Sequence, residues 1–250
     1  MTLQELCQHL KTLLTPDLYN DYCPNGLQVE GEPDVTRIVT AVSASEETIH
    51  AAIDADADVL IVHHGMFWQG DSPVISGSKR RKLQMLLQNG VSLLAYHLPL
   101  DAHNQVGNNW KAAIDLQWQN LAPFGLYRGQ NIGVKGDIAE TSPDAFKTVL
   151  ESYYGHTAYH APGGPTSIRS VALISGGAYK SVVEAAQQGV DAFITGNFDE
   201  PAWYLAQEEG IHFYALGHAA TERVGPKALA TYLQNQFNVS AEFIDIHNPF

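Results

Sequence analysis

The sequence has few cysteines, few cations and no long hydrophobic run. Its 250 residues include only Cys7 and Cys23, which excludes a disulfide framework and a cysteine-based zinc site. Lys and Arg number 14 against 27 Asp and Glu, a net charge of −13, so we expect neither general nucleic-acid binding nor membrane binding. No apolar run approaches the roughly 18 residues of a spanning helix, and the N-terminus lacks a basic segment followed by an apolar core. We therefore expect a cytoplasmic protein.

Short apolar runs alternate with helical patterns along most of the chain. Thr2 and Glu5 have capping-box spacing ahead of leucines at helical intervals, which predicts a first helix that ends before Pro16. The run Val59–Val62 does not alternate in polarity, which is typical of parallel strands buried on both faces. The sequence therefore predicts an α/β fold. Strands are expected at 38–42, 59–62, 91–96, 171–175, 192–195 and 211–216, and further helices at 46–56, 78–88, 179–188, 200–209 and 218–236.

The two halves of the chain are similar to each other. A shift of 133 residues places strand 38–42 on strand 171–175, with Asp58 on Asp191 ahead of the next strand. A shift of 121 residues places His97 on His218. Chance similarity between two βαβ units is the alternative, but the shared aspartate favours two related α/β units.

A boundary between these units is expected in the stretch 117–135, which contains one proline and three glycines. We therefore predict a first unit over residues 1–125 and a second over residues 126–250. The first unit would carry the motifs HHG and HLPLD, and the second would carry GHAATE.

Three predicted strands end in side chains that bind metals. They lead to His63 and His64, to His97 with Asp101 four residues on, and to His218 with Glu222 four residues on. Ligands bind outside the carboxyl ends of parallel strands, so these six side chains are candidate metal ligands. Six nitrogen and oxygen donors suit Zn, Mn, Fe, Co or Ni without selecting among them, and are too many for one tetrahedral ion. The sequence therefore predicts two divalent ions per chain, with Asp101 or Glu222 as the bridging carboxylate.

Each of these clusters alone has an ordinary explanation, since a His-His pair or a His and Glu four residues apart is commonly a surface feature. Three clusters at three strand ends are less readily explained by coincidence. The basic run Lys79, Arg80, Arg81 and Lys82 is either a phosphate-attracting patch or the solvated start of a helix. Gly176-Gly177 is either a phosphate cradle or a tight turn. We interpret the remaining histidines as surface or core residues: His9, His50, His103, His156, His160, His212 and His247.

Seven motifs along the chain form a recognisable set: DYCPNGLQVEG (21–31), IVHHGMFW (61–68), HLPLDAH (97–103), GNN (107–109), TGNFDE (195–200), GHAATER (217–223) and FIDIHNPF (243–250). Together they resemble the Nif-three-like dinuclear metal family, many of whose members are named GTP cyclohydrolase 1 type 2 homologues. The resemblance spans nearly the whole chain and is to the short bacterial form of the family. Two positions depart from the pattern: Asn197 stands where Glu commonly follows, and Ala219 where a bulkier His or Tyr is expected.

The resemblance implies two similar α/β units around a cleft with a dinuclear metal site, assembled as a toroidal homohexamer. The family's ligands fall on His63, His64, Asp101, His218 and Glu222, with His97 close by. The implied function is a metal-dependent hydrolase acting on a nucleotide-like small molecule, with a metal-bound hydroxide as nucleophile and no side chain assigned as catalytic. Substrate binding would fall to Lys79, Arg80, Arg81, Lys82 and Arg223. The alternative is a non-catalytic protein that binds or delivers metal, or a hexamer that sequesters a ligand.

Overall fold

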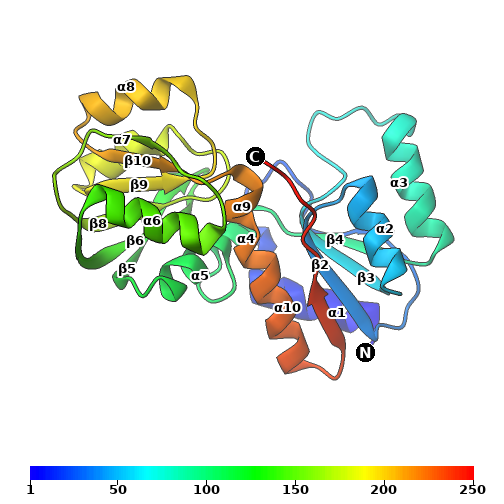
Figure 1. Cartoon of the computed structure of the whole chain (residues 1–250). Coiled ribbons are helices and arrows are strands. Elements are labelled where there is room, and N and C mark those ends of the chain that lie inside the picture. Colours follow the sequence, from blue (N-terminus) through cyan, green and yellow to red (C-terminus); the bar gives the residue numbers. More distant parts are fainter. The chain divides into compact units, whose positions relative to one another are not determined.

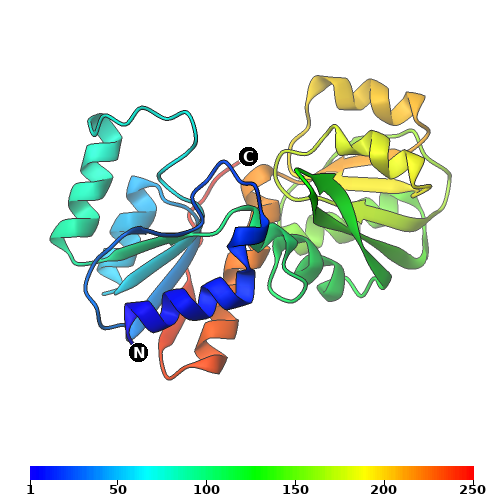
Figure 2. The same ribbon diagram turned by 180° about the vertical axis from the view of Figure 1, so that it is seen from behind.

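The computed structural model describes residues 1–250, which fold into two compact units. Unit 1 comprises Met1–Leu100 and Gly225–His247, and unit 2 comprises Asp101–Val224 and Asn248–Phe250. Each unit contains one β-sheet with helices packed on it (Figures 1 and 2). The predicted α/β class is confirmed. No helix has both the length and the apolar character needed to cross a membrane.

Unit 1 has a five-stranded sheet in the order β1-β4-β3-β2-β11, in which only β1 pairs antiparallel. The strands are β1 (Gly26–Val29), β2 (Arg37–Ser43), β3 (Val59–His64), β4 (Ser92–Ala95) and β11 (Ser240–Phe243). The helices are α1 (Leu3–Leu14), α2 (Glu46–Asp54), α3 (Gly77–Gln88) and α10 (Val224–Gln236), with a 3-10 turn at Pro16–Leu18 and α4 (Leu98–Ala102) leading into unit 2.

Helices cover both faces of this sheet. On one face, Ile49 and Ala52 of α2 and Leu86 of α3 pack into one apolar cluster with alternate residues of β2, β3 and β4. On the other face lie α1 and α10 (Figures 1 and 2), where the Thr40 hydroxyl donates to the carbonyl of Pro226 at 2.8 Å. Helix α1 starts as predicted, because both hydrogen bonds of the Thr2 capping box are present.

Unit 2 has a six-stranded sheet in the order β5-β6-β8-β9-β10-β7, with β8, β9 and β10 parallel. The strands are β5 (Gln119–Tyr127), β6 (Gln130–Thr141), β7 (Tyr159–Ala161), β8 (Ile168–Leu173), β9 (Ala192–Thr195) and β10 (His212–Ala215). The helices are α5 (Asn108–Asp115), α6 (Pro143–Tyr154), α7 (Ser181–Gln187), α8 (Glu200–Glu208) and α9 (His218–Glu222). Helices α5 and α6 pack on one face of the sheet and α7 and α8 on the other, so this unit too has three layers.

The two sheets share a hydrogen-bonding device at the predicted repeat positions. The Asp58 carboxylate accepts from the backbone N–H groups of residues 36 and 37, at 2.7 and 2.8 Å. The Asp191 carboxylate accepts from residues 169 and 170, at 2.8 and 2.9 Å, which is the same pattern displaced by 133 residues. Ser92 pairs with Val59, and His212 with Ala192, so the third strands align at a shift of 120 rather than 121. Gly217, with φ 88°, provides the extra residue before His218.

The units divide at other positions than the expected boundary of 125/126. Residues 101–125 belong to unit 2, because β5 pairs antiparallel with β6. Residues 225–247 return to unit 1, because β11 pairs in parallel with β2. The predicted helix 218–236 is two helices, α9 and α10.

The stretch 117–135 forms most of a β-hairpin in unit 2 instead of a link between units. Tyr127 pairs with Gln130, and the two residues between them, Arg128 and Gly129, have φ angles of 48° and 93°. Two positive φ angles define the type I′ turn that suits a two-residue hairpin. Such turns usually contain Asn-Gly or Asp-Gly. Because Arg128 stands at the first of the two positions, the sequence does not indicate this turn.

A histidine pair joins the edge strand β7 to β10. The ring nitrogens His160 Nε2 and His212 Nδ1 lie 3.2 Å apart, and His212 Nε2 donates to the carbonyl of Pro165 at 2.8 Å. In a His212 ring whose single proton is on Nε2, Nδ1 accepts, so His160 Nε2 is the donor of this contact. Burial, and then the proximity of His212, lowers the pKa of His160 to about 4.

This pair predicts a loss of stability in weak acid. The folded pKa of about 4 lies below the usual histidine value, so between the two values the unfolded chain binds more protons and stability falls as the pH falls. The cost is of order 1 kcal/mol, after a discount for solvent screening of the half-buried ring. We expect the melting temperature of His160→Gln to drop less between pH 7 and pH 5 than that of the wild type. His50→Gln, at an exposed position, is the control, and equal slopes for all three proteins would contradict the prediction.

Candidate metal centre

Three histidines gather at the carboxyl ends of two neighbouring strands in unit 1. His63 and His64 end β3, and His97 follows β4, which pairs in parallel with β3. One ring nitrogen from each of the three lies within 4.8 Å of the others. Strand β3 continues through both adjacent histidines, whose ring centroids are 4.6 Å apart. The strand-end placement expected for these residues is present, and the rings are close enough to share an ion.

The Nδ1 atom of each of these histidines contacts an oxygen of the protein. His63 Nδ1 lies 3.1 Å from the carbonyl of Tyr96, and His97 Nδ1 lies 2.9 Å from a carboxylate oxygen of Asp21. A carbonyl oxygen and a carboxylate oxygen can only accept a hydrogen bond. Nδ1 of His63 and Nδ1 of His97 therefore each carry a proton. His64 Nδ1 lies 3.1 Å from the Ser43 hydroxyl. Nε2 is then the nitrogen of His63 and of His97 that could bind a metal ion, because a metal-bound histidine usually donates its other ring N–H to an oxygen.

Asp21 holds His97 through several hydrogen bonds. Its Oδ1 accepts from His97 Nδ1 and its Oδ2 accepts from the N–H of Leu98 at 3.0 Å. Asn25 donates to Asp21 Oδ2 at 3.0 Å, and its own Oδ1 accepts from the N–H of His97 at 2.7 Å. Burial alone disfavours the ionised form of Asp21, but the hydrogen bond and charge of His97, with the bonds from Asn25 and Leu98, lower the pKa of Asp21 to about 2. Asp21 is therefore an ionised partner for the ring.

Gln28 holds the segment that follows the other two histidines. Its Oε1 accepts from the N–H of Met66 at 2.8 Å, and its Nε2 donates to the carbonyl of Pro24 at 3.0 Å. A Cβ at Gly65 would lie 2.3 Å from Gln28 Oε1, so a larger residue after His64 would displace the Gln28 side chain. The segment 21–28 therefore supports both strand ends that carry the histidines.

In unit 2, Asp101 lies buried on α4, the short helix that follows His97 and has Pro99 in its first turn. Its Oδ1 accepts from Asn108 Nδ2 at 2.9 Å and from the Ser175 hydroxyl at 2.8 Å. Asn109 connects these elements, since its Oδ1 accepts from the N–H of Ser175 at 2.7 Å. The GNN motif at 107–109 therefore fixes the orientation of this carboxylate.

His218 and Glu222 face each other on α9 at the carboxyl end of β10. His218 Nε2 lies 3.2 Å from Glu222 Oε1, and His218 Nδ1 lies 3.1 Å from the side-chain oxygen of Asn197. With Nδ1 donating to Asn197, a neutral ring would point a lone pair at the carboxylate. The contact therefore needs either a proton, on Nε2 or on the carboxyl group, or a metal ion. Asn197 supports the ring although a glutamate was expected there.

The Gly176-Gly177 turn after β8 packs against this pair. A Cβ at Gly176, where φ is 67°, would lie 2.3 Å from Glu222 Oε1 and 3.3 Å from His218 Nε2. The tight turn, one of the two interpretations of these glycines, is what the structure contains, and it makes room for the Glu222 carboxylate.

The basic residues expected to bind substrate are placed as follows. Lys79 lies with its Nζ 4.8 Å from the Phe67 ring centroid and donates to the carbonyl of Ser72 at 3.2 Å. Arg80 is exposed on α3. Arg81 pairs with Glu46 at 2.6 Å, Lys82 donates to the carbonyl of Ala44 at 2.8 Å, and Arg223 donates to the carbonyl of Tyr154 at 3.1 Å.

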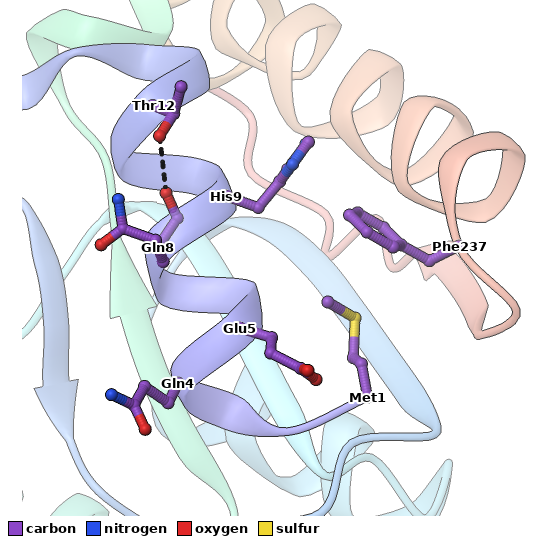
Figure 3. Close-up of a pocket in the computed structure, with 7 residues that line it drawn as sticks. All are labelled: Met1, Gln4, Glu5, Gln8, His9, Thr12 and Phe237. Atoms are coloured by element: carbon purple, nitrogen blue, oxygen red, sulfur yellow. Dashed lines mark hydrogen bonds between the residues drawn. The ribbon is translucent and has the colours of Figure 1, made fainter.

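A pocket of about 710 Å³ lies elsewhere in unit 1, between α1 and Phe237 (Figure 3). It includes His9, whose Nε2 is 3.0 Å from the Tyr232 hydroxyl, and the Thr12 hydroxyl, which donates to the carbonyl of Gln8 at 3.0 Å. Glu5 is its only carboxylate, and this residue serves the N-terminal cap of α1. The pocket contains none of the six candidate ligands.

The fold and these donor sets define a protein of two three-layer α/β units, with groups able to hold metal ions at the carboxyl ends of the strands. A family model described as Duf34/NIF3 (NGG1p interacting factor 3) matches residues 1–249. The chain belongs to the Duf34/NIF3 family, as the motifs indicated.

Named relatives and a solved structure agree with this assignment over the full chain. A protein of Chlamydia pneumoniae named "GTP cyclohydrolase 1 type 2 homolog" is 49% identical over 253 residues, covering 100% of both chains. A protein of the same name from Pseudomonas aeruginosa is 43% identical, covering 100% of this chain and 99% of its own. The crystal structure of TTHA1606 from Thermus thermophilus has a TM-score of 0.89 and 32% identity, with 100% and 99% of the two chains covered.

Proposed function

We propose that the chain binds two divalent metal ions and hydrolyses a nucleotide-like small molecule. Six side chains would hold the ions: His63, His64, His97, Asp101, His218 and Glu222. The observation that carries the proposal is the three-histidine set of unit 1, in which one nitrogen from each ring lies within 4.8 Å of the others. Hydrogen bonds to Nδ1 of His63 and His97 leave Nε2 as the ligating atom of these rings.

The donor chemistry of both units fits such ions. Imidazole nitrogens and carboxylate oxygens without thiolate suit Zn, Fe, Mn, Co or Ni. The contact of His218 Nε2 with Glu222 Oε1 at 3.2 Å calls for a cation, which a divalent ion supplies. When bound, two such ions act as Lewis acids and activate water as a nucleophile. The chain's own part is to orient the rings, through Asp21 and Asn197, and the Asp101 carboxylate, through Asn108 and Ser175.

The names of the curated relatives support the nucleotide-like substrate, since each is called a homolog of a GTP cyclohydrolase. We also propose that Lys79, Arg80, Arg81, Lys82 and Arg223 contribute to the capture of an anionic substrate. A toroidal homohexamer, implied by the motifs, is proposed as the assembly, and sedimentation equilibrium at six times the chain mass would support it.

The test is metal analysis followed by a hydrolysis screen. The purified chain is stripped with a chelator, reloaded separately with Zn, Mn, Fe, Co or Ni, and analysed for bound ions. We expect two ions per chain with at least one of these metals, and turnover of a nucleotide or phosphoester with that metal. Two bound ions without any turnover would favour the non-catalytic alternative, a metal-handling or ligand-sequestering protein. Stoichiometric binding of fewer than two ions would overturn the dinuclear centre.

A further inference from the structure

Two aromatic rings lie against the three histidines of unit 1 and are not among the candidate metal ligands. The Trp68 ring centroid is 5.3 Å from that of His97, at an interplanar angle of 85°, and 5.9 Å from that of His64. The Tyr22 centroid is 5.0 Å from that of His97, at 71°. The Tyr22 and Trp68 centroids are 5.5 Å apart, with their planes inclined by 35°. The two rings therefore form a continuous aromatic wall beside the histidines.

This wall is held in place and remains accessible. Tyr22 follows the anchored Asp21, and its carbonyl accepts from the N–H of Gln69 at 2.7 Å, which ties the two loops together. Trp68 packs on one side against the apolar cluster under α2 and α3. Tyr22 is nevertheless 38% exposed, and Trp68 is partly exposed. Large rings kept partly in solvent at a polar cluster are suited to stack on a ligand.

The charges nearby favour a ligand with an anionic group. Phe67, next to Trp68, carries the ammonium of Lys79 over its ring at 4.8 Å. A planar ring with a phosphate substituent would meet both the aromatic faces and this charge.

We propose that Tyr22 and Trp68 bind the planar heteroaromatic ring of the substrate by stacking, beside the histidines of the metal centre. This inference rests on the proposed function for the role of the histidines and for a phosphorylated heteroaromatic substrate, and it adds the two side chains that would bind the ring of that substrate. Stacking on an aromatic side chain depends little on the identity of the ring, because every base has a π-face. Replacement of one ring of the wall is expected to weaken binding about tenfold.

The test compares ligands with and without a ring. Guanosine, cytidine and nicotinamide mononucleotides and ribose 5-phosphate are titrated calorimetrically into the metal-loaded full chain. At least one mononucleotide should bind more tightly than ribose 5-phosphate. Trp68→Leu and Tyr22→Leu should each weaken that mononucleotide about tenfold and leave ribose 5-phosphate and the metal content unchanged. Trp68→Phe, which keeps a ring, should recover most of the affinity.

Trp203→Leu is the matched control, because Trp203 is 42% exposed but lies on α8 of unit 2. It should change neither affinity. The proposal is overturned if no mononucleotide binds more tightly than ribose 5-phosphate, or if Trp68→Leu and Tyr22→Leu weaken both kinds of ligand equally. The proposed function fails separately. If the substitutions weaken mononucleotide binding but the chain shows no turnover, the stacking proposal holds and the hydrolase proposal fails. If the chain shows turnover but Trp68→Leu and Tyr22→Leu leave mononucleotide affinity unchanged, the hydrolase proposal holds and the stacking proposal fails.

Discussion

Replacement of Asp21 by alanine is expected to lower metal affinity by about 10- to 100-fold, although Asp21 is not proposed as a ligand. The side chain of Asp21 is 2% exposed, and its Oδ1 accepts from His97 Nδ1 at 2.9 Å. Without it, the His97 ring loses the contact that keeps the proton on Nδ1 and directs Nε2 to an ion. The affinity is measured by competition with a chromophoric chelator.

The same substitution should also destabilise the chain. The Asp21 carboxylate accepts from the N–H groups of Tyr22 at 2.7 Å and Leu98 at 3.0 Å, as well as from Asn25 and His97. Removal of an acceptor that leaves buried donors unsatisfied typically costs about 1–3 kcal/mol. Urea denaturation in the presence of a chelator measures this cost apart from the metal.

Two further variants separate charge from shape. Asp21→Asn keeps the size of the side chain but loses the charge, and its amide group must face at least one donor, so both effects should persist in weaker form. Asp17→Ala removes an aspartate that is 76% exposed and paired with Lys11 at 2.8 Å. Such a surface pair contributes about 0–1 kcal/mol, and metal affinity should not change. Wild-type affinity in Asp21→Ala would show that His97 does not need this partner, or is not a ligand.

The candidate ligands could be found from the sequence because each follows a recognisable element. The run Val59–Val62 ends directly in His63 and His64, and the sheet places His97 on the adjacent strand. Because the carboxyl ends of parallel strands lie at one edge of the sheet, the position of a side chain at a strand end was enough to predict which distant side chains lie near it. The repeat could also be predicted from the sequence, because the aspartate that marks it has a local role. Asp58 and Asp191 make the same contacts with the backbone of the preceding strand.

The residues that position the ligands could not be assigned in this way. Asp21 lies 76 positions before His97 in the sequence, and no periodicity links a loop residue to a distant strand end. By residue type, Asn25-Gly26 indicates only a turn, whereas in the structure Asn25 Oδ1 also accepts from the N–H of His97. The motif DYCPNGLQVEG resembles the family's pattern, but its role depends on contacts that only the folded chain provides.

The return of residues 225–247 to unit 1 was hidden for the same reason. Strand β11 pairs with β2, about 200 residues earlier in the chain, and its four residues show no strong strand pattern. The hairpin of β5 and β6 was missed because Pro123 and the glycines mark a loop by composition. In the sheet, Pro123 pairs with Val134 near the sheet edge, where proline is tolerated.

Gly176→Ala is expected to abolish metal binding by the donors of unit 2. The new Cβ would lie 2.3 Å from Glu222 Oε1, a separation that requires a shift of either the backbone or the carboxylate. The backbone is held in place, because the carbonyl of Gly176 accepts from the N–H groups of Gly196 at 2.8 Å and Asn197 at 3.0 Å. Its N–H also donates to the Thr221 hydroxyl at 3.0 Å. Glu222 is therefore the group that must move, away from His218.

Gly210→Ala is the matched control for this substitution. Gly210 has a φ angle of 69°, close to the 67° of Gly176, but a Cβ there would meet no atom within 4 Å. Both variants carry the cost of alanine at a positive φ, about 1–2 kcal/mol, so the difference between them isolates the displacement of Glu222. The measurement is the rise in melting temperature on addition of metal, because an ion that binds only the folded chain stabilises it by mass action. Gly210→Ala should keep the wild-type rise, and Gly176→Ala should lose the part of it that the donors of unit 2 contribute. An undiminished rise in Gly176→Ala would mean that the Glu222 carboxylate does not hold a metal ion.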